Sequence, residues 1–473
     1  MTVIIPPSRQ DTRLISWRSV IFVCLLLGAL KAGAIVVSAV GILLCVWALL
    51  GARQSIQALT LMVTIKHLNP TLITQSGEFG IISWVLLLIS GLRLLLAGSL
   101  RHLKLLMPLL AFALVVAMLL AVQTNRYPEV SVMKLLIFTY GSATLLLGFA
   151  ALKDADADKL VVWFFSLFTA VILLSLPTFA FPSVAYARNG TGFQGILSHP
   201  QTFGPMLAPV VCWLLAGIFF TQKAKLTKSF LLALTLIALM VKSEARTGIV
   251  AVALSIAATF LVAFIKSKRF KTFRLGRFVG LAILTVAIAS LGIASSMTLR
   301  DKLAGFIFKH ESKTIEQAMS SRTGGVASQW KFFLEEPLIG HGFGVYASGE
   351  FPSDIVKVMG IPISAPVEKG FLPTAILEET GLVGASALLY LLVSLGARVA
   401  QNRNPRWLAV FFACLFVNVG EMVFFSLGGI GLYFWLWLGL STRIDSKPDE
   451  KFKTIRKPIH ETTPAIQLRG SMS

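Results

Sequence analysis

Long apolar runs separated by short polar segments dominate the sequence. The clearest lie near residues 79–98, 105–122, 131–150, 160–181, 201–220, 228–242, 247–265, 278–296, 373–397, 407–425 and 427–441. A helix of about 20 such residues crosses a hydrocarbon core roughly 30 Å thick. The runs are apolar throughout and do not alternate with polar residues, which excludes a membrane β-barrel. The pattern therefore predicts membrane-spanning helices.

The N-terminal part of the chain contains two closely spaced apolar runs between residues 18 and 50, preceded by arginines. The first could serve as a signal peptide with a cleavage site at residues 32–34. Because the second run follows at once, we expect an uncleaved helical hairpin with a cytoplasmic N-terminus. The next segment, 55–68, fits either a short crossing or a helix at the membrane interface.

Loop charges predict the topology. Lysine and arginine gather at 101–104, 223–225, 266–271 and 403–406, which we expect on the cytoplasmic side. Counting outward from these loops places 123–130, 182–200, 243–246 and 297–372 on the opposite, external face, which we call the periplasmic side. The interval 297–372 is too long for a simple connector, and we expect short helices there, folded over the membrane face.

Together these patterns predict an all-α, polytopic integral membrane protein with about 12–14 transmembrane helices and one long periplasmic loop. A cytoplasmic N-terminus and a cytoplasmic tail require an even number of crossings. The predicted parts are a cytoplasmic N-terminus (1–18), an N-terminal transmembrane bundle (19–296), the periplasmic loop (297–372), C-terminal transmembrane helices (373–441) and a basic cytoplasmic tail (442–473).

Composition agrees with this fold class. Hydrophobic residues make up 56% of the chain and charged residues 14%, with a mean hydropathy of +0.79, whereas soluble domains are about one quarter charged. The net charge of +21 follows from basic loops, and no soluble basic domain is long enough to bind nucleic acid. The four cysteines lie far apart inside apolar runs, without the spacing of a disulfide or zinc site.

Three arginines fall on the predicted periplasmic side, each near serine, threonine or glycine: Arg188, Arg246 and Arg322. The guanidinium fork binds phosphate oxygens in a bidentate way, and small neighbours let a phosphate approach backbone amides. The arginines therefore predict a site for a membrane-bound diphosphate. Arg246 could instead cap a helix end or pair with Glu244, and Arg322 could pair with Glu316.

Candidate acid–base residues lie on the same side. His341 stands among glycines that expose its imidazole, and His199 precedes a proline at a predicted helix start, where an interfacial role is the alternative. Glu368 precedes the C-terminal helices. Glu378 and Glu379 open the first of these helices, where carboxylates favour the helix dipole; we expect a structural role for at least one of them.

Several motifs stand in a characteristic order. They are Ser198–Gly204 (Ser-His-Pro-Gln-Thr-Phe-Gly), Ser243–Gly248 (Ser-Glu-Ala-Arg-Thr-Gly), the stretch from Arg322 through Pro337–Gly344 (Pro-Leu-Ile-Gly-His-Gly-Phe-Gly) and Glu378–Gly384 (Glu-Glu-Thr-Gly-Leu-Val-Gly). Over roughly residues 160 to 440 the chain resembles the O-antigen ligase and polysaccharide polymerase superfamily of membrane proteins. The His-Pro-Gln and Leu-Asn-Pro elements are more similar to the exopolysaccharide-polymerase branch.

The resemblance implies glycosyl transfer at the periplasmic face of the bacterial inner membrane. The donor would be a glycan on a polyprenyl diphosphate, and the acceptor a hydroxyl of a glycan or lipid. Membrane lipid and other polysaccharide assembly and export proteins would be further partners. Arg246 and Arg322, helped by Arg188, would bind the diphosphate. No metal or other cofactor is expected.

The general base is left open by the resemblance. Many relatives have a His-Asn pair before the final acidic-Gly-Leu element, where this chain has Glu368 and Lys369. Glu368, His341 and His199 are therefore the candidates.

Two other classes of function compete with this reading. A transporter, such as a flippase of lipid-linked sugars or an exporter, would also use basic residues, but at mid-membrane on broken helices. A scaffold in a polysaccharide assembly complex would need no site residues at all.

Overall fold

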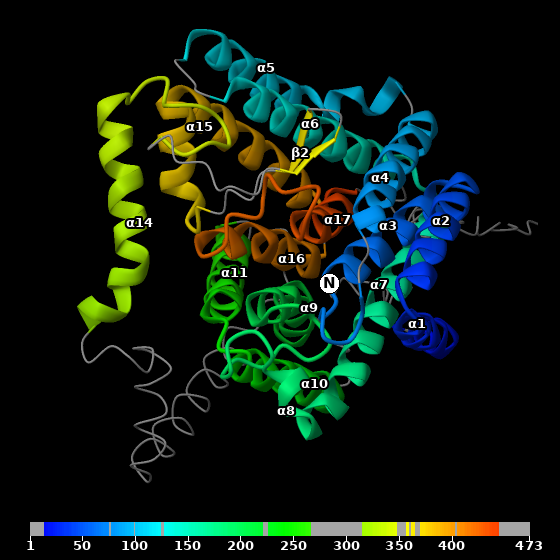
Figure 1. Ribbon diagram of the computed structural model, residues 1–473. Coiled ribbons are helices and arrows are strands. Elements are labelled where there is room, and N and C mark those ends of the chain that lie inside the picture. Colours follow the sequence, from blue (N-terminus) through cyan, green and yellow to red (C-terminus); the bar gives the residue numbers. More distant parts are fainter. Residues whose placement is uncertain are drawn as a thin grey trace, which may run out of the picture.

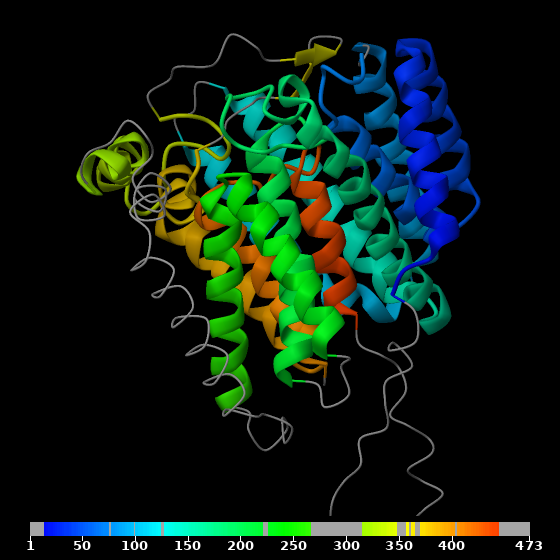
Figure 2. The same cartoon turned by 90° about the horizontal axis from the view of Figure 1, so that it is seen from below.

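The computed structural model describes residues 14–74, 77–98, 100–123, 127–220, 226–265, 315–347, 356–358, 361–364, 369–402 and 404–443. Nearly all of them fold into helices that form one bundle with largely antiparallel neighbours (Figures 1 and 2). The helices are α1 (Trp17–Ala29), η2 (Leu30–Ala32), α2 (Ala34–Leu49), α3 (Ala52–Lys66), α4 (Gly77–Ala97), η3 (Leu100–Leu105), α5 (Met107–Val122), α6 (Pro128–Ala151), α7 (Asp154–Ser175), η4 (Leu176–Ala180), α8 (Pro182–Ala185), α9 (Pro200–Phe220), α10 (Leu226–Lys242), α11 (Arg246–Ile265), α14 (Ile315–Glu335), α15 (Leu372–Val399), α16 (Pro405–Phe416), η5 (Val417–Val419) and α17 (Gly431–Thr442).

Six helical segments among the described residues are long and apolar enough to cross a membrane. They are Gly77–Ala97, Pro128–Ala151, Asp154–Ala180, Pro200–Phe220, Arg246–Ile265 and Leu372–Val399. Shorter apolar helices accompany them at Ala34–Leu49, Met107–Val122 and Pro405–Val419. Leucine, isoleucine and valine side chains are exposed along α2, α4, α5, α10 and α15, as expected for helices that face lipid. The coarser part of the prediction, a helical fold whose helices are able to cross a membrane, is therefore confirmed.

The N-terminal hairpin and the helix after it follow the apolar pattern. Helices α1 and α2 form the expected pair, joined through Gly33, whose φ of 122° suits a residue without a Cβ. Segment 55–68 belongs to α3, which is buried on nearly all sides and packs against α2, α4 and α7. Its polar residues are accommodated by local bonds, such as Ser55 Oγ to Ala48 O (2.7 Å). The alternative of a surface helix at the interface does not apply.

The prediction of one span over 407–425 is wrong. Helix α16 ends at Phe416, and an irregular segment follows η5 until α17 begins at Gly431. Asn418 explains the break, because its side chain competes with the helical backbone bonds. Its Nδ2 donates to Cys414 O (2.9 Å), and its Oδ1 accepts from the N–H groups of Val423 (3.0 Å) and Phe424 (2.7 Å).

The long interval 297–372 also differs from expectation. Instead of short helices alone, it contains the 21-residue helix α14 and a small antiparallel pair of strands, β1 (Val356–Val358) and β2 (Ile361–Ser364). The strands are a minor exception to the all-α prediction. Helix α14 runs nearly perpendicular to the bundle axis, so that it is seen almost end-on in Figure 2. The predicted span 278–296 and the terminal regions 1–13 and 444–473 lie outside the described residues.

The bundle has two polar ends. At one end, where α9, α11 and α17 begin, Lys66 Nζ donates to Gly428 O (2.6 Å); we call this the site end. At the opposite end Arg53 pairs with Asp156 (2.9 Å), and Arg443 pairs with Asp154. Among the described residues, the loops of Arg188, His199 and Arg246 are thereby separated from the predicted cytoplasmic residues 101–104 by the length of the helices.

Candidate functional site

Helix α15 is interrupted at Gly381, where φ is 58° and ψ is −165°. Such a break leaves backbone groups without partners inside the helix. On its C-terminal side the N–H groups of Leu382 and Val383 donate to the carbonyls of Pro337 (2.9 Å) and Leu338 (3.2 Å). The loop after α14 thus supplies the missing acceptors.

The same loop supplies the missing donors on the other side of the break. The N–H groups of His341 and Gly342 donate to the carbonyls of Glu378 (2.9 Å) and Glu379 (3.0 Å). Loop 337–344 and the break in α15 therefore complete each other's backbone hydrogen bonds. This pairing gives a physical reason for the co-occurrence of the two glycine-containing motifs.

Glycine is required where these two segments meet. Gly340 has a φ of 69°, and a Cβ there would lie 2.5 Å from the Thr380 nitrogen. A Cβ on Gly381 would collide with the carbonyl of Leu338. Both positions combine a left-handed backbone with a contact too close for any side chain.

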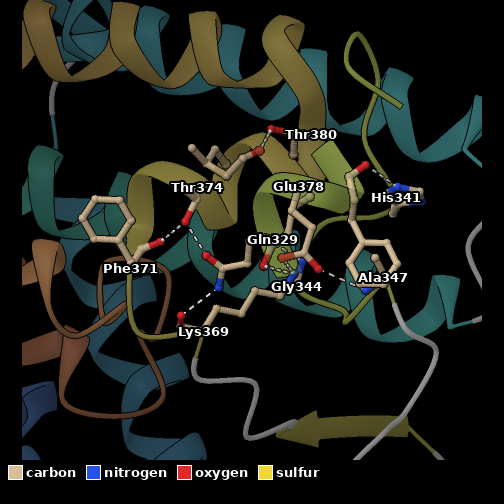
Figure 3. A network of polar contacts seen from close by, with 12 residues as sticks. Gln329, His341, Gly344, Ala347, Lys369, Phe371, Thr374, Glu378 and Thr380 are labelled. Atoms are coloured by element: carbon tan, nitrogen blue, oxygen red, sulfur yellow. Dashed lines mark hydrogen bonds and ion pairs between the residues drawn. The ribbon is translucent and has the colours of Figure 1, made fainter. Parts of the chain in front are cut away.

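Beneath this junction lies a group of buried charges (Figure 3). Lys369 Nζ lies 3.0 Å from Glu378 Oε2 and 3.3 Å from Glu379 Oε1, and all three side chains are at most 3% exposed. These contacts are ion pairs and lack the alignment of hydrogen bonds. The other oxygen of each carboxylate accepts a backbone N–H, from Ala347 to Glu378 (3.1 Å) and from Gly344 to Glu379 (2.8 Å).

A fourth charge joins this group from α6. Lys134 interacts electrostatically with Glu379 and Lys369, and its Nζ lies 5.2 Å from the centre of the Phe343 ring. We call Lys134, Lys369, Glu378 and Glu379 the Lys369 cluster. It contains two basic and two acidic side chains, which can compensate one another's charge in a buried site.

Sequence reasoning missed two residues of this region. Lys134 stands inside the predicted apolar span 131–150, where a lone lysine signals a buried carboxylate partner. Gln123, at the end of α5, donates through Nε2 to the carbonyls of Ile339 and of Glu379 (3.0 Å). The sequence gives no comparable sign of the role of Gln123, because its hydrogen-bond partners are backbone carbonyls that are distant in the sequence.

Helix α14 is attached to the start of α15 through polar side chains. Gln329 Nε2 donates to Lys369 O (2.8 Å), and Thr374 Oγ1 donates to Gln329 Oε1. His341 is attached to the same helix: its Nε2 lies 2.8 Å from Phe332 O. Since a carbonyl can only accept, Nε2 carries a proton, and in the neutral imidazole Nδ1 is the unprotonated nitrogen.

The second group of candidate residues lies where the loop before α9 packs on the turn between α10 and α11. Phe193 N donates to Lys242 O (2.9 Å), and Thr191 Oγ1 donates to Glu244 Oε2 (2.9 Å). A Cβ on Gly192 would lie 2.6 Å from Ser243 O. The two backbone segments leave no room for a side chain at position 192, which explains why this residue is glycine.

Glu244 has an unusual backbone conformation in this turn. Among the described residues it is the only non-glycine with a positive φ, 54°, a conformation that costs free energy and often occurs at functional sites. Arg246 follows as the first residue of α11 and is half-buried, whereas Arg188 is exposed in the facing loop. We call Arg188, His199, Glu244 and Arg246 the Arg246 cluster.

His199 immediately precedes α9, and a backbone N–H of that helix holds its imidazole ring. Its Nδ1 accepts the N–H of Gln201 (3.0 Å), so that Nε2 carries the proton of the neutral ring. Partial burial, and then the positive charge of Arg188, lower the pKa of His199 below its usual value. The ring is therefore a neutral hydrogen-bond donor, and its basic nitrogen is already occupied.

Another motif residue supports this loop. Asn69 N donates to Ile196 O (2.8 Å), and Asn69 Nδ2 donates to Val184 O (2.9 Å). Leu68 and Leu197 form an isolated bridge. The Leu-Asn-Pro and His-Pro-Gln elements, about 130 residues apart in the sequence, thus lie side by side and position His199.

The segment between α16 and α17 connects the two clusters. Thr247 Oγ1, next to Arg246, lies 3.5 Å from Glu421 Oε1. Four residues later, the Phe425 ring packs on Phe343 at 5.0 Å between ring centres. The irregular segment that replaces the predicted span therefore brings both clusters to the site end.

The remaining predicted site residues are only partly placed. Arg322 belongs to α14, although its side chain lies outside the described part of the structure, and Glu368 lies wholly outside it. Figure 2 shows α14 beside the end of the bundle at which α11 begins. Within the described ranges, no group of three or more histidine, cysteine, aspartate and glutamate side chains is arranged to hold a metal ion.

The fold and site define a helical bundle with helices able to cross a membrane and two polar clusters at one end. Neither the models of known protein families nor the curated protein sequences include a match to the chain.

Proposed function

We propose that the protein is a bacterial inner-membrane glycosyltransferase that polymerises or ligates surface polysaccharide at the periplasmic face. It would transfer a glycan from a polyprenyl diphosphate to a hydroxyl of a second glycan or a lipid. The observation that carries the proposal is that the loop of Arg188 and His199 packs on the turn leading into Arg246 at the site end. Residues 417–430 contact both this region and the loop of His341. The motif resemblance supplies the reaction class.

Charge and hydrogen-bond donors suit the Arg246 cluster to an anion. Arg246 and Arg188 would bind the diphosphate oxygens together with Arg322, and the His199 Nε2–H would donate a further hydrogen bond. As the bond between the anomeric carbon and the diphosphate oxygen breaks, the electron pair leaves on the diphosphate. Guanidinium groups held in place before the reaction stabilise that developing charge.

The proton of the attacking hydroxyl needs an acceptor. We assign this role to His341, because its Nε2–H is fixed on Phe332 O and its Nδ1 is the unprotonated nitrogen. His199 is the weaker candidate, since the Gln201 N–H already occupies its Nδ1. Glu368, one residue before the buried Lys369, is the remaining alternative.

The test is glycan length in cells that produce Arg246→Ala at the normal protein level. We expect polymer to fall about a hundredfold or more, the usual effect of removing one transition-state donor, while lipid-linked precursor accumulates. Arg53→Ala at the opposite end is the matched control, because it removes an arginine from a partly exposed ion pair of small energetic value. Unchanged polymer in Arg246→Ala contradicts the proposal.

A reconstituted system separates the enzyme from a transporter. Purified protein in vesicles with lipid-linked glycan should change the covalent structure of the glycan, as seen by mass spectrometry. Movement of the intact lipid-linked glycan across the bilayer, without any new glycosidic bond, supports a flippase instead.

A further inference from the structure

Helix α14 has three different sides along its second half. Its bundle-facing stripe consists of Val326, Gln329 and Phe333, of which Gln329 and Phe333 are 5% and 7% exposed. One residue later in register, about 100° around the helix, Ala327, Trp330 and Leu334 form an exposed apolar stripe. A further 100° on, Ser328, Lys331 and Glu335 form an exposed polar stripe.

The apolar stripe is large and does not end with the helix. Trp330 is 47% exposed and Leu334 is 61% exposed, and Leu338 in the following turn is 62% exposed. Leu338 O accepts the N–H of Val383, which is itself exposed on α15. The stripe therefore continues into the exposed apolar face of α15, one of the helices long enough to cross a membrane.

The orientation of α14 relative to the bundle indicates what covers its exposed apolar stripe. Helix α14 lies across the direction of the bundle helices and beside the bundle, nearer its middle than β2 (Figure 2). A helix at that level, parallel to the membrane plane, has its outer sides at the boundary between head groups and acyl chains. Tryptophan and leucine on one stripe with lysine and glutamate on the next are typical of helices at this boundary.

We propose that α14 is a membrane-surface helix whose Trp330 and Leu334 side chains, together with Leu338 of the following turn, insert into the lipid leaflet at the site end. The occupant of the exposed stripe is bilayer lipid, and the stripe extends the lipid-facing surface of α15. This inference does not depend on glycosyl transfer. It also places the backbone of Arg322 at head-group depth, where a lipid-linked diphosphate would lie; that consequence rests on the proposed function.

Nitroxide labels in the full-length protein, reconstituted in phospholipid nanodiscs, test the placement. Cys24 and Cys45 are replaced by alanine, whereas Cys212 and Cys414 are buried and stay. Labels are then attached through Leu334→Cys on the apolar stripe and through Glu335→Cys on the polar stripe. Leu389→Cys on the exposed face of α15 provides the lipid reference.

We expect the label at position 334 to collide readily with dissolved oxygen and poorly with a water-soluble nickel chelate, as at position 389. The label at the neighbouring position 335 should show the reverse, with a several-fold lower ratio of oxygen to nickel accessibility. Equal nickel accessibility at 334 and 335 overturns the proposal, because α14 then lies in water. Low accessibility to both reagents at 334 also overturns it, because protein then covers the stripe. Trp330→Cys repeats the measurement if the first variant fails to fold.

Discussion

At the scale of single residues, the most demanding feature is the burial of Lys369 between Glu378 and Glu379. Removing three charged groups from water is favourable only when each finds compensation. The lysine contacts both carboxylates, and each carboxylate also accepts a backbone N–H. The two amides belong to the loop that carries His341. The cluster therefore determines where that loop lies relative to α15.

Removing the lysine charge should destabilise the protein strongly. Lys369→Met leaves two adjacent buried carboxylates with less compensation, for which we expect a loss of about 3–5 kcal/mol in the free energy of unfolding. The measurement is the thermal unfolding midpoint in detergent. Lys331→Met, on the exposed side of α14, should change the midpoint little. Equal midpoints for the two variants would show that the ion pairs contribute nothing to the fold.

His199 provides a prediction of pH dependence. Its pKa in the folded protein lies below the unfolded value of about 6.5, so the unfolded state binds more protons at acidic pH. The neutral ring therefore favours the folded state fully above about pH 6.5, and this contribution declines as the pH falls toward the folded pKa.

Arg188 is the second cause of that shift, after burial, so its removal should raise the pKa of His199 only part of the way. Histidine-selective NMR titration of Arg188→Gln measures the change. Arg53→Gln at the opposite end should leave the titration as it is. A pKa that stays the same in Arg188→Gln would place the two side chains too far apart to share a ligand.

At the scale of elements, the break in α15 organises the Lys369 cluster and loop 337–344. Gly381 creates the break, and the loop satisfies the backbone groups that it leaves open. The irregular segment after α16 has a similar origin, since Asn418 takes over backbone bonds there. In both places a polar or flexible residue interrupts an apolar helix, and the interruption contributes to the site end.

Substitution of Gly381 tests the element directly. In Gly381→Ala a side chain would occupy a backbone conformation that is almost restricted to glycine and would collide with the Leu338 carbonyl. We expect a loss of about 2 kcal/mol or more in unfolding free energy. Gly80→Ala on α4 is the control, because a Cβ there meets nothing within 4 Å; it should be neutral or slightly stabilising. A tolerated Gly381→Ala would mean that the break is not needed.

At the scale of the whole molecule, the helices separate two sets of polar contacts. The Arg246 and Lys369 clusters lie at the site end, while the pairs Arg53–Asp156 and Arg443–Asp154 lie at the other. The exposed apolar faces between the two ends fit a bilayer. Basic loops predict that the end with Arg53 is cytoplasmic.

Cysteine labelling in intact cells checks this orientation. Asn189→Cys, exposed at the site end, should react with a maleimide that cannot cross the inner membrane. Asp158→Cys, exposed at the opposite end, should react only after lysis. The background is low, because the native cysteines are buried or half-buried in apolar helices. Labelling of Asp158→Cys alone in intact cells would invert the topology and contradict the proposed function.

Much of the fold could be predicted from the sequence, because lipid-facing helices show their length and apolar character directly. The hairpin up to residue 50 and the long spans from α4 to α11 follow that signal. Prediction failed where a helix is apolar yet interrupted, as in 407–425. There Asn418 decides the outcome through backbone partners that hydropathy does not reveal.

The sequence indicated which segments carry the candidate site residues, but it did not indicate which of these residues contact one another. Residue types on the predicted periplasmic side made Arg188, His199, Arg246, Arg322, His341 and Glu368 candidates; the Arg322 side chain and Glu368 lie outside the described residues. Sequence alone could not show that His199 is a neutral donor, since this depends on the Gln201 amide and the neighbouring Arg188. It also could not show that Lys134 lies in the field of a carboxylate more than 240 residues away, Glu379.

The sequence by itself determined that the chain forms apolar helices and which polar loops share a side, because burial in lipid requires long uncharged segments and biases the loop charges. Only the tertiary structure decided which charges meet. The break at Gly381 and the turn at Asn418 bring distant segments together, and compensation of buried charges depends on distances that no local pattern encodes.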